Sequence, residues 1–331
     1  MGKPKIAVLA GRALFESFFD DGLQARLEAM AHWSLKPRAV VRSLAQCDAL
    51  ITTWDSPRLE KDLLQEVPGL RFIAHCGGEV KKKFAVELFS QMVITNTAEP
   101  MAKPTAELGA AILLASARDL VGYAMKMRRR SNRIYHTVHE NGGGANSLIG
   151  REVGLIGFGR IGRALVDLLT GFDIRWRIYD PYVQERVEAP RNSRYEGLDE
   201  VLRCSSMLVL AAAATRETER LLNAKRLALL PNGATVINIA RGSLIDLGAL
   251  TQEVVSGRLR CALDVTDPDE PLPVAHPLRS HPGAILTPHV GGGGPTVRRQ
   301  MASMTLDSLE RHFAGLPPLH QITVDMLERM T

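Results

Sequence analysis

Short apolar runs alternate with helical patterns along this chain, in two successive series. In the first series the apolar runs lie at residues 5–9, 39–41, 49–52, 70–74 and 92–95. In the second series they lie at residues 153–156, 175–179, 207–211, 234–239, 262–265 and 284–287. Strands that alternate with helices form parallel sheets, because each crossover helix returns the chain to the same end of the sheet. We therefore predict an α/β protein with two parallel-sheet domains.

Prolines and a long apolar helix mark the boundary between the two series. Pro100 and Pro104 precede a helix predicted over residues 105–127, and a glycine-rich loop is expected at residues 141–144. The chain has 331 residues, 45% of them hydrophobic, which is enough for two cores. We expect the tail to pack back on the first domain. The predicted domains are residues 1–100 plus 295–331, and residues 101–294.

Composition argues against nucleic-acid, membrane and metal functions. The formal charge is +5, but the densest basic runs, residues 81–83 and 128–130, are each interpreted as a solvated helix face, and aromatic residues make up only 5% of the chain. No apolar run reaches the roughly 18 residues that cross a bilayer, and the apolar stretch near the N-terminus is too short for an export signal. We expect a cytoplasmic protein. The cysteines predict neither a disulfide framework nor a zinc site, because they lie far apart: Cys47, Cys76, Cys204 and Cys261.

A glycine-rich turn opens the second series. Gly157, Gly159 and Gly162 form a G-x-G-x-x-G motif between an apolar strand and an amphipathic helix, where backbone N–H groups can approach a pyrophosphate. Asp180 ends the next strand, where a dinucleotide fold needs an acceptor for the ribose hydroxyls, and its charge would repel a 2′-phosphate. NAD is therefore predicted over NADP. The alternatives are a purely structural glycine turn, and a phosphate contact from Arg175 or Arg177.

Three polar segments follow strands of the same predicted sheet. They supply a guanidinium at Arg241, a carboxylate at Glu270 or Asp269, and an imidazole at His289. Hydride transfer to a 2-oxo acid needs a planar cation for the substrate carboxylate and a group that exchanges a proton with the 2-oxygen. A carboxylate beside the imidazole orients it and favours its protonated form. Each residue alone could be an ordinary loop residue, but their joint placement at strand ends favours a catalytic group.

With these motifs the chain resembles the D-isomer-specific 2-hydroxyacid dehydrogenases, most strongly over residues 150–292. The resemblance implies two Rossmann-like or flavodoxin-like domains, with the nucleotide domain inserted into a discontinuous substrate domain. It also implies an active site between the two domains and a homodimer built mainly from the nucleotide domains. In the first domain, residues 74–80 resemble the family's substrate loop.

The resemblance also assigns roles to individual residues. Arg241 corresponds to the family's substrate arginine and His289 to its acid/base histidine. The spacing from Asp264 points to Asp269 as the histidine's carboxylate partner, whereas the position before a Pro-Leu-Pro stretch points to Glu270, which we prefer. The implied cofactor residues are Gly157, Gly159, Arg160, Ile161, Gly162, Asp180, Thr215, Ala240 and Asp264. The implied substrate residues are His75, Gly77, Gly78 and Arg241.

The sequence thus predicts an NAD-dependent oxidoreductase that interconverts a small 2-oxo acid and its D-2-hydroxy acid. Which acid it uses is left open. Two alternatives remain: a non-catalytic NAD(H)-sensing protein that resembles the corepressors of this family, and a formate dehydrogenase. Turnover of 2-oxo acids with NADH, or of formate with NAD, separates the three.

Overall fold

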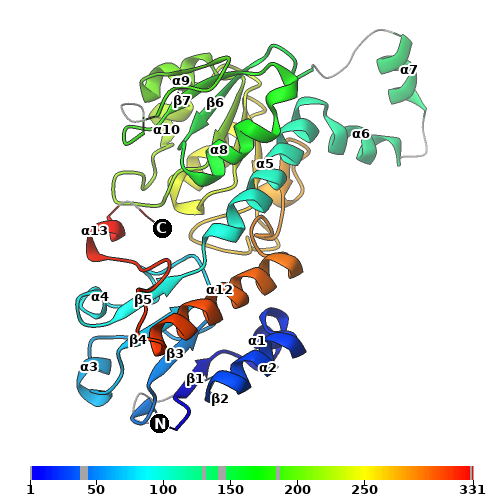
Figure 1. Ribbon diagram of the computed structural model, residues 1–331. Coiled ribbons are helices and arrows are strands. Elements are labelled where there is room, and N and C mark those ends of the chain that lie inside the picture. Colours follow the sequence, from blue (N-terminus) through cyan, green and yellow to red (C-terminus); the bar gives the residue numbers. More distant parts are fainter. Residues whose placement is uncertain are drawn as a thin grey trace. The chain divides into compact units, whose positions relative to one another are not determined.

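The computed structural model describes residues 2–37, 44–128, 132–140, 147–183, 187–328 and 330. The chain divides into two compact units: unit 1 comprises Met1–Met101 and Gly293–Thr331, and unit 2 comprises Ala102–Gly292 (Figure 1). The strand predicted at residues 39–41 and the loop predicted at residues 141–144 lie outside the described residues.

Unit 1 is built on a five-stranded parallel sheet in the order β2-β1-β3-β4-β5. Its strands are β1 (Lys5–Leu9), β2 (His32–Leu35), β3 (Ala49–Thr52), β4 (Phe72–His75) and β5 (Val93–Asn96). Its helices are α1 (Arg12–Phe18), α2 (Asp21–Met30), α3 (Leu63–Glu66), α4 (Leu88–Gln91), η2 (Glu99–Met101), α12 (Pro295–Phe313) and α13 (Val324–Leu327).

Helices cover both faces of the unit 1 sheet, which explains its almost continuously apolar strands. In β1, Ile6 and Val8 pack with α1, α2 and α12, whereas Ala7 and Leu9 pack with α3 and α4 on the opposite face. Figure 1 shows α12 crossing its face of the sheet. The tail returns to the sheet edge, where the Ile322 N–H donates to the Ile94 carbonyl at 2.8 Å.

Unit 2 carries a seven-stranded parallel sheet in the order β12-β11-β10-β9-β6-β7-β8. Its strands are β6 (Glu152–Ile156), β7 (Arg175–Tyr179), β8 (Ser193–Tyr195), β9 (Met207–Leu210), β10 (Thr235–Asn238), β11 (Arg260–Leu263) and β12 (Ala284–Leu286). Its helices are α5 (Ala102–Ala117), α6 (Leu120–Met127), α7 (Arg133–Glu140), α8 (Arg160–Leu168), η3 (Thr170–Phe172), α9 (Leu198–Cys204), α10 (Ala224–Leu227), η4 (Gly242–Leu244), α11 (Leu247–Val255) and η5 (Pro277–Arg279). One face packs on α5 and α8, the other on α9, α10 and α11.

The structure corrects the long helix predicted over residues 105–127. The chain breaks after α5, and Asp119 adopts a left-handed conformation with φ of 45° before α6 begins. The Asp119 carboxylate bonds Arg260 at 2.6 Å and Lys126 at 3.3 Å, which secures the break. Among the described residues no single helix is long and apolar enough to cross a bilayer, and one pair bent by 60° meets the length and composition criteria only together.

Other local predictions also needed tertiary information. The edge strands β2 and β8 were missed, because they are short and only partly buried and so lack a continuous apolar run. Residues 81–83 form a turn and not a helix face, and the Lys83 ammonium donates to the Trp54 and Ser56 carbonyls. Of the basic run at residues 128–130, the described part, Arg128, ends α6.

Candidate active site

The loops that carry the predicted chemistry of unit 2 all follow strands of its parallel sheet. They therefore emerge at the same edge, the carboxyl edge, in the sheet order that runs from β12 to β7. The order reverses between β6 and β9, and open α/β sheets bind ligands at such a switch point. The topology alone places the glycine-rich loop, Arg241 and His289 along one edge.

The three glycines of the loop after β6 have different reasons to be glycine. Gly157 has φ of +93°, and a Cβ there would lie 2.5 Å from the backbone of Ala212. A Cβ at Gly162 would overlap the Gly157 carbonyl oxygen, so this glycine permits close helix-on-strand packing. Gly159 precedes α8, and a Cβ there would meet no atom within 4 Å. Space in front of a helix N-terminus fits a pyrophosphate.

Asp180 is fixed beside this loop at the end of β7. Its Oδ2 accepts the Phe158 N–H at 2.8 Å, and its Oδ1 accepts the Tyr182 N–H at 3.0 Å. The Tyr182 hydroxyl in turn donates to the Glu217 carboxylate. The structure therefore holds a carboxylate next to the loop, in the position that a dinucleotide fold uses for ribose hydroxyls.

The structure settles what the two arginines of β7 do. The buried Arg177 guanidinium donates to both Glu152 and Glu196 at 2.9–3.0 Å, and these bonds raise its pKa and lower the pKa of Glu152. Arg175 begins β7, at the end opposite Asp180. Arg175 is separated from the carboxyl edge by the length of the strand, which has five residues with a rise of about 3.3 Å each.

The remaining predicted cofactor residues lie on the same edge, among them Asp264, which directly follows β11. Arg160 and Ile161 begin α8, Arg160 being exposed and Ile161 half-buried. Thr215 follows β9 in a turn in which its N–H donates to the Thr218 hydroxyl at 2.7 Å. Ala240 follows β10, and its N–H donates to the side-chain oxygen of Asn238 at 3.0 Å.

His289 and Glu270 are in direct contact. The Glu270 Oε1 lies 2.6 Å from His289 Nδ1, whereas Asp269 uses its backbone carbonyl to accept the Thr266 hydroxyl. The side chains of His289 and Glu270 are 49% and 39% exposed, so a solute can reach the pair. Because Nδ1 faces Glu270, Nε2 is the nitrogen left for proton exchange with a ligand.

Arg241 is held through its backbone. Asn238 donates its side-chain amide to the Arg241 carbonyl at 2.8 Å, and the Arg241 guanidinium donates to the Ala240 carbonyl at 2.7 Å. A Cβ at Gly242 would overlap the Thr266 backbone, so the loops after β10 and β11 are closely packed. Sequence reasoning assigned no role to Asn238. Its signal was an amide side chain at a strand end, where such residues bond backbone groups two or three positions later.

The predicted substrate loop belongs to unit 1 and follows β4. The His75 imidazole is buried, bonds the Thr52 hydroxyl through Nδ1 at 2.9 Å and lies edge-on to Phe84. Burial lowers its pKa to about 3, and its Nε2 has no hydrogen-bond partner among the described residues. A Cβ at Gly77 would overlap Nε2, so glycine is required against this ring. The side chain of His75 thus supports the loop from within unit 1.

Gly78 lies in the same loop and is only half-buried. Its carbonyl accepts the Asn96 amide at 3.2 Å, and the Gly77 carbonyl accepts the Thr97 N–H at 3.0 Å. The loop after β5 therefore supports the loop after β4, which leaves the backbone of Gly77 and Gly78 as a rigid segment at the carboxyl edge of unit 1.

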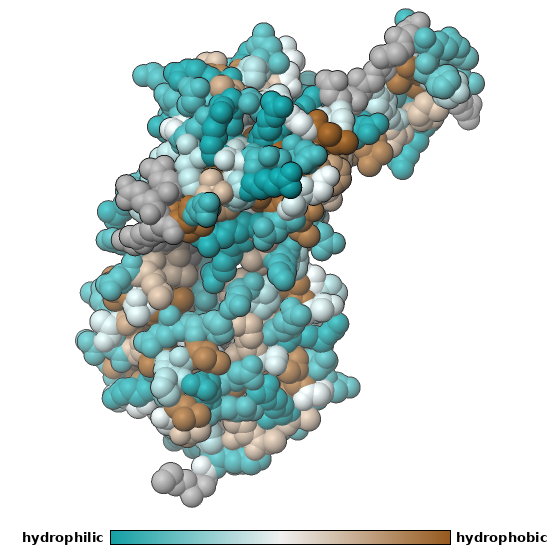
Figure 2. Space-filling view, turned by 45° about the horizontal axis from the view of Figure 1, so that its top comes forward, coloured by the Kyte–Doolittle hydropathy of each residue, from teal (hydrophilic) through white to brown (hydrophobic). Residues whose placement is uncertain are grey.

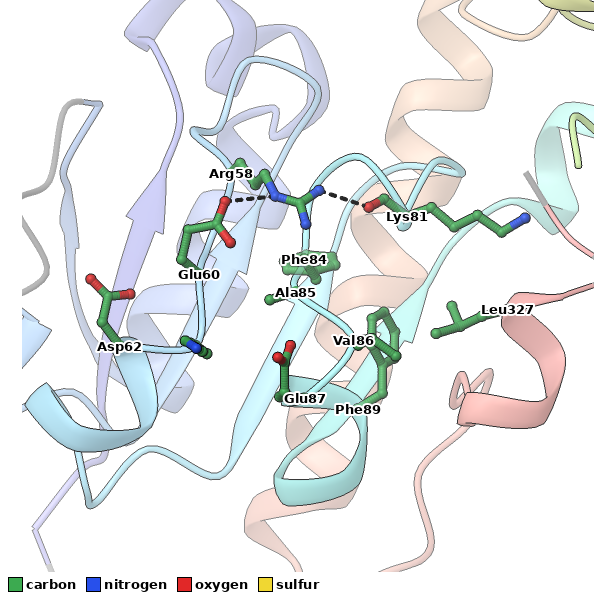
Figure 3. A pocket seen from close by; sticks show the side chains of 11 residues that line it. Arg58, Glu60, Asp62, Lys81, Phe84, Ala85, Val86, Glu87, Phe89 and Leu327 are labelled. Carbon is green, nitrogen blue, oxygen red and sulfur yellow. Dashed lines mark hydrogen bonds and ion pairs between the residues drawn. The ribbon is translucent and has the colours of Figure 1, made fainter. Parts of the chain in front are cut away.

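A separate pocket of about 740 Å³ lies on unit 1 between the segments that follow β3 and β4 and the helix α13 (Figure 3). Phe84, Phe89 and Leu327 form apolar parts of its wall, and Arg58 and Lys81 line its rim. None of the predicted site residues lines it. Among the described residues, no group of three or more His, Cys, Asp or Glu side chains could hold a metal ion.

Comparison with known proteins identifies the family. Residues 110–291 match the model of the D-isomer specific 2-hydroxyacid dehydrogenase, NAD binding domain. A glyoxylate reductase of Pyrococcus horikoshii is 32% identical over 290 residues, which cover 85% of each chain. A solved Thermus thermophilus protein is 28% identical with a TM-score of 0.78, and covers 96% of this chain and 100% of its own.

A glyoxylate/hydroxypyruvate reductase of Sinorhizobium meliloti, solved with NADP and malonate, has the same fold. Its TM-score is 0.77 at 23% identity, over 99% of this chain and 98% of its own. Together with the glycine-rich loop and the paired His289 and Glu270, the matches in sequence identify the chain. It belongs to the D-isomer specific 2-hydroxyacid dehydrogenases, nicotinamide-dependent enzymes that interconvert 2-oxo acids and 2-hydroxy acids.

Proposed function

We propose that the protein reduces a small 2-oxo acid to its D-2-hydroxy acid with NADH, with His289 as the acid/base. The observation that carries the proposal is the 2.6 Å contact between His289 Nδ1 and Glu270 on the sheet edge that also carries the glycine-rich loop. The nicotinamide, when bound, supplies the hydride. The proton must come from the protein, and the exposed imidazole of His289 supplies it through Nε2.

Glu270 and Arg241 complete the proposed chemistry. The Glu270 carboxylate, 2.6 Å from Nδ1, orients the imidazole so that Nε2 is the nitrogen left to donate a proton during reduction. Arg241 provides a planar cation that can bind a carboxylate through two parallel hydrogen bonds. Asn238 bonds its backbone carbonyl, and its guanidinium donates to the Ala240 carbonyl at 2.7 Å. In the oxidative direction neutral His289 accepts the proton instead.

We propose NAD over NADP because of Asp180. Both of its oxygens are fixed beside the glycine-rich loop, so the charge cannot move away from a 2′-phosphate without breaking two hydrogen bonds. Arg177 is engaged by two carboxylates, and Arg175 lies at the far end of β7. Neither arginine is placed to neutralise the negative charge of a 2′-phosphate.

We propose further that the protein is a homodimer joined through α6 and α7. These helices project from the rest of unit 2, and neither contains a buried residue (Figure 1). Leu120, Met125 and Tyr135 are 62%, 59% and 50% exposed, and apolar side chains gather on this segment (Figure 2). Eight-residue helices are marginal without packing, so a second copy would stabilise them. Sedimentation of Met125→Glu should show a monomer if this surface forms the dimer.

The test of the catalytic proposal is a panel of 2-oxo acids assayed with NADH and with NADPH by loss of absorbance. Turnover with at least one acid and a preference for NADH are expected. His289→Ala should lower kcat by about 100-fold or more, the usual contribution of a general acid, while NADH binding measured by fluorescence stays unchanged. The control is His32→Ala, which removes an exposed imidazole of unit 1 and should leave kcat as it is.

Two outcomes would replace the proposal. Tight NADH binding without turnover of any 2-oxo acid would favour the sensing protein. Production of NADH from formate would favour formate oxidation, because formate carries no 2-oxygen that needs a proton from His289.

A further inference from the structure

One buried carboxylate is bonded to every part of the turn that carries His289. Asp264 follows β11 and is 3% exposed. Its Oδ1 accepts the Thr287 hydroxyl at 2.6 Å and the Val290 N–H at 3.0 Å, and its Oδ2 accepts the Gly291 N–H at 3.0 Å. Its backbone carbonyl accepts the His289 N–H at 3.0 Å. Asp264 thus bonds residues before, at and after the imidazole.

The turn needs such bonds because its conformation is unfavourable. His289 has φ of 53°, in the left-handed region that residues with a side chain adopt infrequently. Such a conformation persists only where the surroundings hold it, and it is often found at functional sites. The donors from Val290 and Gly291 follow His289 directly, so Asp264 closes the turn on the side where the chain would otherwise relax.

We propose that Asp264 is a positioning residue for His289, which fixes the imidazole through the turn and not through contact with the ring. The inference rests on the proposed function of His289. It goes beyond the cofactor contact that the family resemblance implies, because the turn of His289 engages three of the roughly four acceptor positions of the carboxylate. A role in positioning predicts loss of proton transfer, whereas a cofactor contact predicts loss of NADH affinity.

Two substitutions separate these roles. Asp264→Asn keeps the shape but replaces one acceptor oxygen by an NH₂ group, which then faces a backbone N–H or the Thr287 hydroxyl. Thr287→Val removes only the hydroxyl that donates to Asp264 and leaves the carboxylate in place. Thr287→Ser keeps that hydroxyl and is the matched control.

The expected result is a split between chemistry and binding. Asp264→Asn should lower kcat at saturating NADH by about 100-fold, the scale of an error of about 1 Å in a catalytic group. Thr287→Val should lower kcat by about fivefold, the equivalent of one hydrogen bond, and Thr287→Ser should match the wild type. The dissociation constant of NADH, read by fluorescence, should stay within about twofold of the wild-type value in all three variants, because the hydrogen bonds of the Asp264 carboxylate hold the His289 turn and not the glycine-rich loop.

Hydrogen exchange provides a readout that does not depend on activity. The amides of Val290 and Gly291 should exchange faster in Asp264→Asn than in the wild type, without faster exchange in β6 or α8. Unchanged exchange at both amides would overturn the proposal. So would a rise in the NADH dissociation constant with kcat preserved at saturation, because that pattern belongs to a cofactor contact.

Failure of the proposed function would look different. A wild-type protein that turns over no 2-oxo acid, yet shows the faster exchange in Asp264→Asn, would retain the role of Asp264 in the turn and exclude His289 as a catalyst. If Asp264→Asn does not fold, the pair Thr287→Val and Thr287→Ser decides: equal kcat values and equal exchange in the two would overturn the proposal.

Discussion

Gly157 and Gly159 lie two positions apart in one loop, yet we expect alanine to lower the stability of the fold at Gly157 and the affinity for NADH at Gly159. At Gly157 the φ of +93° is unfavourable for alanine by roughly 1–3 kcal/mol. The added Cβ would also lie 2.5 Å from the Ala212 backbone, an overpacking that typically costs about 1–3 kcal/mol. Gly157→Ala should therefore lower the free energy of unfolding by about 4 kcal/mol, a large fraction of the roughly 5–15 kcal/mol of a typical domain.

Gly159→Ala should leave the fold almost intact. The added methyl group meets no atom within 4 Å, and φ of −76° suits alanine. Alanine is a poorer residue than glycine before a helix, but it also reduces the entropy of the unfolded chain, so the net change should stay within about 1 kcal/mol. The methyl group would occupy the space in which we expect a pyrophosphate to meet the N-terminus of α8. We expect at least about tenfold weaker NADH binding, which corresponds to about 1.4 kcal/mol.

Urea unfolding with and without NADH measures both effects. At 100 times the wild-type dissociation constant, NADH should stabilise the wild type by about 2.7 kcal/mol and Gly159→Ala by about 1.4 kcal/mol. Without NADH, only Gly157→Ala should be strongly destabilised. The reasoning would be refuted if Gly159→Ala lost as much stability as Gly157→Ala, or if its response to NADH equalled that of the wild type.

Three further outcomes test other parts of the structure. Burial lowers the pKa of His75 from 6.5 to about 3. Between these pH values the unfolded state binds more protons than the folded state, so the free energy of unfolding should fall as the pH drops through this range. In urea unfolding, His75→Gln should make this fall shallower by on the order of 1 kcal/mol per pH unit. Burial raises the pKa of Cys76 and of Cys261 to about 12, so a thiol reagent at pH 8 should modify at most two of the four native cysteines, and modification of three would contradict this burial. Asn238→Ala removes the amide that bonds the Arg241 carbonyl, and steady-state assays should show a KM for the 2-oxo acid raised about fivefold, with NADH affinity unchanged as the control.

Much of the fold could be predicted because its signals are local. The strands of both sheets are apolar on both faces, so runs such as residues 5–9 and 153–156 stand out in the sequence. The exceptions have equally local reasons. β2 and β8 lie at sheet edges, and the break before α6 depends on a conformation of Asp119 that is secured by Arg260, a residue far along the chain.

In the candidate site, too, the locally encoded features could be predicted and the contacts between distant residues could not. Its residue types and strand-end positions were visible in the sequence, as was the glycine-rich loop, because a strand, a turn and a helix N-terminus are neighbours along the chain. The choice between Asp269 and Glu270 was not, since it depends on which side chain of a proline-rich loop faces the turn after β12. The spacing of residues along the chain does not reveal that Asp269 is the exposed carboxylate that leaves this contact to Glu270.

The sequence by itself determined two parallel sheets, the dinucleotide loop and the set of polar residues at the strand ends. Only the tertiary structure decided how those residues are used: Arg177 binds two glutamates, His75 is buried, and Asp264 holds the turn of His289. The physical reason is that apolar periodicity specifies elements over a few residues, whereas the partner of a polar side chain depends on which loops the sheet order brings together.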